Sequence, residues 1–144
     1  MAEFESRGGG RELVHGRITD QILGAFYTTY DALGFGFLES VCVNALKREL
    51  AERGLSVKSE YPIDVFYKGG KIGHFRADLL VDNSVIVEAK ASRQIDDADH
   101  KQVLNYLRGS TIEVGLLLHF GPKPNFRRLF FDQEAKARLT APTR

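Results

Sequence analysis

The stretch from Phe75 to Lys90 constrains the fold more than any other part of the sequence. It carries two segments of alternating apolar and polar residues around a short polar segment, which predicts a β-hairpin. Residues two apart in a strand point to the same side of a sheet, so Glu88 and Lys90 share a face, and Asp78 lies on the preceding strand. The predicted hairpin therefore brings two carboxylates and an ammonium group toward one side of a sheet.

The opposite side of the hairpin is expected to be core, because it is apolar along both strands. Its members are Phe75, Ala77, Leu79 and Val81 on the first strand and Val85, Val87, Ala89 and Ala91 on the second. This pattern predicts one buried face and one face that carries charge.

The turn between the two strands decides whether the charges meet. A three-residue turn over 82–84 sets Val81 opposite Val85 and therefore Asp78 opposite Glu88. Directly opposed residues have Cβ atoms about 5 Å apart, which allows both carboxylates to ligate one ion. A two-residue turn would turn Asp78 to the other face. We therefore predict the three-residue turn.

The chemistry of these groups indicates a divalent metal ion acting on a phosphodiester. Mg²⁺ prefers a few carboxylates together with waters and phosphate oxygens, and Asp78 and Glu88 match that preference, with the backbone carbonyl of Ala89 as a further ligand. Lys90, on the same face, would position the attacking water and stabilise the charge that develops. No second histidine stands at metal spacing in the sequence, which argues against zinc.

The same tripeptide occurs twice, so it carries little information by itself. Glu134-Ala135-Lys136 repeats Glu88-Ala89-Lys90, but it lies in a polar stretch with helical character and not after an apolar strand. The alternative for the first copy is an exposed ion pair at a sheet edge. Its position after a strong strand, with an aspartate ten residues upstream, favours the functional interpretation.

The rest of the chain predicts a mixed α/β fold with a mostly antiparallel sheet flanked by helices. Apolar spacing predicts helices over 18–33 and 37–53, and a third from an Asp96 N-cap to Arg108. Strands are predicted over 57–67, 71–81, 85–91, 111–120 and 127–131, with a turn at Gly69-Gly70 and a short helix over 133–138. Pro62 places the first strand at an edge or a bulge.

Composition sets the remaining bounds. We expect a flexible tail over 1–15 and a single domain over 16–144. The net charge of +1 gives no strong overall field, so nucleic-acid binding would depend on a local basic patch. A single cysteine, Cys42, and the lack of any apolar membrane span favour a reducing compartment, and we expect a cytoplasmic protein with no membrane partner.

Several motifs in collinear order resemble the PD-(D/E)XK nuclease superfamily, which has the restriction-endonuclease-like fold, and within it the GxxExxY family. The matching stretches are 33–41 (LGFGFLESV), 67–70 (YKGG), 75–81 (FRADLLV), 88–90 (EAK), 102–107 (QVLNYL) and 115–121 (GLLLHFG). The resemblance extends from about Ile18 to Phe131. Cys42 departs from it, because the family motif has a tyrosine at that position.

The resemblance implies roles for further residues. It implies that Glu39, on the second helix, joins Asp78 and Glu88 at the metal, and that Gln102 supports the site. Arg76, Arg93 and Lys101 are basic residues near the expected site, and Tyr106 shares a helix face with Gln102; these four are the expected contacts to nucleic acid.

The resulting hypothesis is a nuclease that uses Mg²⁺ or Mn²⁺ to hydrolyse phosphodiester bonds, with DNA as the expected substrate. One alternative is a non-catalytic module that kept the fold and binds nucleic acid or a protein. Another is a metal-dependent phosphohydrolase acting on small nucleotides. Strand preference, cutting mode and oligomeric state stay open, although a chain this short would cut duplex DNA most readily as a homodimer.

Overall fold

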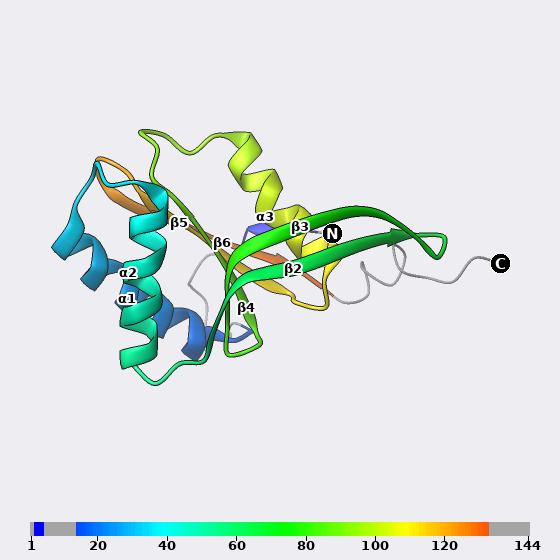
Figure 1. Cartoon of the computed structure of the whole chain (residues 1–144), viewed down its shortest axis with the longest axis horizontal. Coiled ribbons are helices and arrows are strands. Elements are labelled where there is room, and N and C mark those ends of the chain that lie inside the picture. The colour runs from blue at the N-terminus through cyan, green and yellow to red at the C-terminus, as the bar shows by residue number, and fades with distance from the viewer. Residues whose placement is uncertain (1, 5–13, 133–144) are drawn as a thin grey trace.

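The computed structural model describes residues 2–4 and 14–132, which form a six-stranded sheet with helices packed against it (Figure 1). In chain order the elements are β1 (Ala2–Phe4), α1 (Gly16–Leu33), α2 (Glu39–Glu52), β2 (Val57–Tyr67), β3 (Gly70–Val81), β4 (Val85–Lys90), α3 (Asp97–Gly109), β5 (Val114–Phe120) and β6 (Pro124–Phe131). The predicted succession from the first helix to the last strand is confirmed. Each helix in these ranges is too short or too polar to span a membrane.

The sheet is mixed and mostly antiparallel, as predicted. Its strand order is β1-β6-β5-β4-β3-β2, and every described pair of neighbours is antiparallel except β4 and β5. A parallel pair needs a crossover connection, which α3 supplies by packing back against the sheet. β2 lies at an edge, where Pro62 removes no hydrogen bond to an outer neighbour.

Helices bury both faces of the sheet, so the prediction of a single buried face is wrong. On one face α1 and α2 pack against β4, where Phe26 and Val87 are fully buried. On the other face α3 packs against the same strand, with Leu107 and Ile86 fully buried. The face that carries Glu88 therefore also contains core, and Glu88 is only 3% exposed. The charged groups lie at the boundary of this second core.

β3 changes face at Asp78, whereas the residue pattern predicts uninterrupted alternation. Leu79 packs with α1 and α2, but Ala77, two residues earlier, packs on the α3 side. The ladder between β2 and β3 pairs Ser59 with Leu79 and Tyr61 with Ala77, and it skips the position between them, where Asp78 faces Glu60. Glu60 has a φ of 49°, which does not continue the pleat of a strand. The two strands consequently twist at this point.

The turn between β3 and β4 has the predicted length. Val81 pairs with Val85, so the turn consists of three residues, and the Asp78–Glu88 register follows. Asp82 and Asn83 adopt left-handed φ values of 49° and 53°. The Asp82 carboxylate also accepts a hydrogen bond from the Ser56 backbone N–H at 2.8 Å, which ties the turn to the start of β2.

The turn between β2 and β3 lies one residue earlier than predicted. Tyr67 pairs with Gly70, so the central residues are Lys68 and Gly69 and not the two glycines. Both central residues have positive φ, 49° and 78°, as in the type I′ turns that match the twist of a hairpin. Lysine occupies this strained position without any sequence signal for it.

The predicted chain ends differ from the structure or lie outside its described residues. A flexible tail is predicted over residues 1–15, but Ala2–Phe4 pair with β6 as an edge strand. The helix predicted over 133–138, with its Glu134-Ala135-Lys136 tripeptide, lies outside the described residues. The division into a tail and a single domain stays a prediction.

We expect the turn at Asn83 to tolerate glycine and to resist a β-branched residue. Valine is strained at positive φ, so Asn83→Val should lower the free energy of unfolding by about 1–2 kcal/mol. Asn83→Gly should leave it within about 0.5 kcal/mol, because glycine adopts this conformation freely. Urea unfolding of the two variants measures both effects. Equal stability of the two would contradict the left-handed conformation of the turn.

Candidate active site

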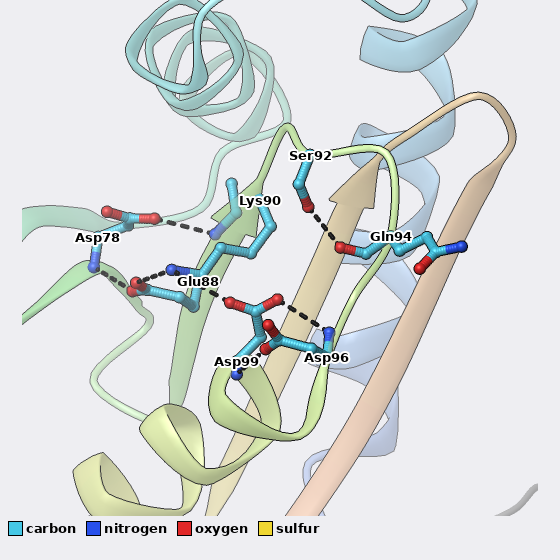
Figure 2. A network of polar contacts seen from close by, with 8 residues as sticks. Asp78, Glu88, Lys90, Ser92, Gln94, Asp96 and Asp99 are labelled. Carbon is cyan, nitrogen blue, oxygen red and sulfur yellow. Dashed lines mark hydrogen bonds and ion pairs between the residues drawn. The ribbon is translucent and has the colours of Figure 1, made fainter.

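Asp78 and Glu88 meet where β3 and β4 separate. The ladder between these strands extends from Val81–Val85 to Leu79–Val87 and goes no further. Beyond it the two carboxylates replace the missing backbone acceptors. The Asp78 backbone N–H donates to Glu88 Oε1 at 3.0 Å, and the Ala89 backbone N–H donates to Asp78 Oδ2 at 2.9 Å (Figure 2). This reciprocal pair holds both acids side by side at the open end of the hairpin.

Lys90 lies between two carboxylates on the same side of the sheet, as its spacing from Glu88 predicts. Its Nζ is 3.7 Å from Glu88 Oε2 and 3.9 Å from Asp99 Oδ1 (Figure 2). The lysine side chain is 17% exposed, so its ammonium group is largely withdrawn from solvent. Lys90 therefore connects the strand carboxylates to the first turn of α3.

Asp99 is a site residue that sequence reasoning missed. It is the third residue of α3, where its Oδ2 accepts the Asp96 backbone N–H at 3.1 Å while Asp96 Oδ1 accepts the Asp99 N–H at 3.0 Å. This capping box orients the Asp99 carboxylate so that its other oxygen faces Lys90. The sequence signals the cap, but the contact with Lys90 depends on where α3 sits over the sheet.

Glu39 lies beside these acids at the start of α2. It lines a hollow of about 410 Å³ together with Ser40, Val43, Asn44, Lys47, Ser59, Glu60 and Asp78, which we call the polar hollow. The charges of Lys90 and Asp78 both act on the Glu39 carboxylate. Glu60 adds a further carboxylate to the polar hollow, and no sequence pattern singles it out. The structure thus brings Glu39, Asp78, Glu88 and Lys90 into one region.

The carboxylates are held in surroundings that disfavour their ionisation. Burial, followed by the charge of Asp78, raises the pKa of Glu88 from 4.5 to about 7. Burial also raises the pKa of Asp78 and the pKa of Glu39, against the opposing effect of the Lys90 charge. Close to neutral pH, binding of a proton or of a cation therefore lowers the electrostatic free energy of this site.

These side chains suit a small divalent cation that keeps several water ligands better than they suit a cation coordinated by protein atoms alone. In the described ranges, no three His, Cys, Asp or Glu side chains already stand together as a group able to hold a metal ion. The reciprocal hydrogen bonds occupy only one oxygen of Asp78 and one of Glu88. Mg²⁺ is commonly held by one or two carboxylates and keeps its waters, so this pair matches Mg²⁺ chemistry.

Gln102 and Tyr106 share a face of α3, as predicted, but they differ in access. Tyr106 is 3% exposed, and its ring centroid lies 5.7 Å from that of Phe75. Burial, with the nearby charge of Glu88, raises the pKa of Tyr106. A buried ring cannot contact nucleic acid directly, so that expectation for Tyr106 is wrong, and Tyr106 is a core residue.

The three basic residues expected to contact nucleic acid are all exposed. Arg76 precedes Asp78 by two residues on β3, Lys101 lies on α3, and Arg93 follows Lys90 in the loop to α3. The guanidinium carbon of Arg93 stands 5.8 Å from the ring centroid of Phe35, in the loop between α1 and α2. All three side chains are therefore accessible to a ligand in solvent.

Comparisons with known proteins agree with this architecture. Residues 16–129 match the family model described as the PD-(D/E)XK nuclease superfamily. The crystal structure of SSO0001 is similar in fold, with a TM-score of 0.51 and 18% sequence identity over 87% of this chain. The chain spans 64% of the length of SSO0001, and at this identity the similarity shows the fold alone. No curated protein sequence matches the chain.

We expect the unfavourable ionisation of Glu88 to make the stability of the fold depend on pH. Because its folded pKa is raised from 4.5 to about 7, protonation of Glu88 stabilises the fold fully below about pH 4.5, and this contribution is lost as pH rises through about 7. In metal-free buffer, Glu88→Gln should therefore be more stable than the parent chain by roughly 1–3 kcal/mol near pH 8 and about equal to it near pH 4. Denaturant unfolding with a chelator at both pH values tests this.

Glu52→Gln is the matched control, because the Glu52 side chain is 65% exposed on the surface of α2. Its stability relative to the parent should not depend on pH in this range. A Glu88→Gln variant that is less stable than the parent near pH 8 would contradict the proposed burial of the charge.

Proposed function

The chain belongs to the PD-(D/E)XK nuclease superfamily, and from this premise we propose that it is a Mg²⁺-dependent nuclease that hydrolyses phosphodiester bonds of DNA. The observation that carries the proposal is the contact of Asp78, Glu88 and Lys90 at the point where β3 and β4 separate. Glu88 is buried and Asp78 half-buried, so each raises the cost of ionising the other, and a bound cation would relieve this repulsion.

In this proposal Asp78 and Glu88 hold the metal ion, with Glu39 and the Ala89 carbonyl as the further ligands. Bound Mg²⁺ or Mn²⁺ would supply charge neutralisation for the phosphate and a lowered pKa for the attacking water. The neighbouring acids keep the site negative enough to attract a cation. The Ala89 N–H bond to Asp78 keeps that carboxylate in place before a cation arrives.

Lys90 would position the water and stabilise the extra negative charge on the phosphate during attack. Its ammonium group is a compact donor held between Glu88 and Asp99, so it is orientated without being buried in the core. Gln102 would support the site from α3. Arg76, Arg93 and Lys101 would contact phosphates of the bound strand.

Within the superfamily we assign the chain to the GxxExxY family. Gly36 and Glu39 supply the glycine and the glutamate of that motif, and Cys42 replaces its tyrosine. Gly36 has a φ of 124°, a conformation that favours glycine, and Glu39 begins α2 beside Asp78. Cys42 is 1% exposed and packs in the core, so its replacement leaves the charged residues unaffected.

Removal of either central group should abolish cleavage. Purified Asp78→Ala and Lys90→Ala should lose at least about 100-fold of the Mg²⁺-dependent activity of the parent on DNA, because each loses a group that acts on the reacting phosphate. Lys136→Ala is the control, since it changes the same tripeptide in its second copy. Equal activity in all four proteins would mean that a contaminant cuts the DNA.

Metal binding can be tested separately from cleavage. Saturating Mg²⁺ or Mn²⁺ should raise the melting temperature of the parent, because a ligand held only by the folded state stabilises it by mass action. Glu88→Gln should abolish this gain, and Glu52→Gln should retain it. A parent chain that binds DNA but gains no stability from either metal would instead be a non-catalytic binding module.

A further inference from the structure

Exposed apolar side chains gather at the corner between α1 and α2. Phe35, Phe37 and Leu38, which we call the apolar corner, are 42%, 49% and 74% exposed. Val41, one turn into α2, is also exposed. Leaving such side chains in water costs free energy, so a contiguous group of them marks a surface that contacts something.

The apolar corner adjoins the active site on two sides. Leu38 is followed directly by Glu39, which lines the polar hollow with Asp78. On the other side Phe35 carries the Arg93 guanidinium, which belongs to the loop that begins after Lys90. The apolar corner is therefore joined to the site through Glu39 and through Arg93.

Two glycine conformations and a backbone hydrogen bond define the backbone of the apolar corner. Gly34 has a φ of 67° and donates its N–H to the Tyr30 carbonyl at 2.7 Å, which closes α1. Gly36 has a φ of 124°. A Cβ at either glycine would meet no atom within 4 Å, so the glycines serve the backbone conformation and not close packing. The backbone thus presents the two phenylalanine rings outward in a defined way.

We propose that the apolar corner stacks unpaired bases of the substrate, so that the enzyme acts on single-stranded or locally opened DNA. This inference rests on the proposed nuclease function and specifies its substrate class. The bases of a duplex are paired and stacked on one another, and only an unpaired base offers a free face to an aromatic ring. With a net charge of +1, the protein also needs such contacts to hold a polyanion.

The charge around the corner favours nucleic acid over a protein partner or a second copy. Arg93 covers one face of Phe35, and its guanidinium remains available to a phosphate next to the stacked base. An apolar protein surface placed here would bury that cation and cover the opening beside Glu39. A second exposed group, formed by Phe66, Tyr67 and Ile72 at the β2–β3 turn, lies at the far end of β3 from Asp78 and serves as a control.

The experiment measures binding of a short labelled single strand and of its duplex by fluorescence anisotropy, with Mg²⁺, in a Lys90→Ala background that should not cut. The single strand should bind at least about tenfold more tightly than the duplex. Phe37→Ala, and more strongly Phe35→Ala with Phe37→Ala, should weaken single-strand binding by roughly 5- to 100-fold. Phe37→Trp should restore it, because tryptophan also stacks on a base.

Two controls test whether base stacking at this corner is what holds the single strand. Phe66→Ala with Tyr67→Ala removes equally exposed rings elsewhere and should leave single-strand binding within about twofold. A strand with 2-aminopurine should show fluorescence quenching on binding that Phe37→Ala abolishes. Duplex binding as tight as single-strand binding, or a dimer that only Phe37→Ala dissociates, would overturn the inference.

Failure of this inference and failure of the proposed function give different results. In the chain with its native Lys90, hydrolysis of the small diester bis(p-nitrophenyl) phosphate reports on the phosphodiester chemistry alone, because it requires no DNA strand to bind. If the native chain does not hydrolyse this diester or any DNA with Mg²⁺, the nuclease function itself is wrong. If it hydrolyses the diester but the corner variants bind single strands normally, only the substrate assignment is wrong.

Discussion

The exchange of hydrogen bonds between Asp78 and the strand that carries Glu88 is the interaction on which the rest of this site depends. A β-ladder that simply stopped at Leu79 would leave buried N–H groups without acceptors, at a cost of about 1–3 kcal/mol each. Here the two carboxylates accept those N–H groups. The fold therefore needs these two carboxylates as hydrogen-bond acceptors, although their burial and mutual repulsion destabilise it.

Side chains from two helices complete the electrostatic surroundings of these acids. α2 contributes the Glu39 carboxylate next to Asp78, and α3 contributes Asp99, whose orientation is set by its own N-terminal cap. Lys90 lies between the strand acids and the helix acid and partly neutralises both. The positive charge of Lys90 is thus shared between acids of the sheet and of α3.

Much of this arrangement is predictable from the sequence, because strand periodicity and turn length are local properties. The three-residue turn, the shared face of Glu88 and Lys90 and the Asp96 cap all follow from neighbouring residues. The contact of Asp99 with Lys90, the burial of Tyr106 and the change of face at Asp78 do not. Each depends on the position of α3 over the second face or on the left-handed backbone of Glu60, and neither leaves a pattern in the residues themselves.

The parallel pairing of β4 with β5 has a consequence for the order of folding. The hairpin of β3 and β4 closes a three-residue loop and can form early, whereas β5 can join β4 only after the chain has crossed through α3. Asp78 and Glu88 therefore come together through local contacts, while Asp99 reaches Lys90 only with the slower, non-local step.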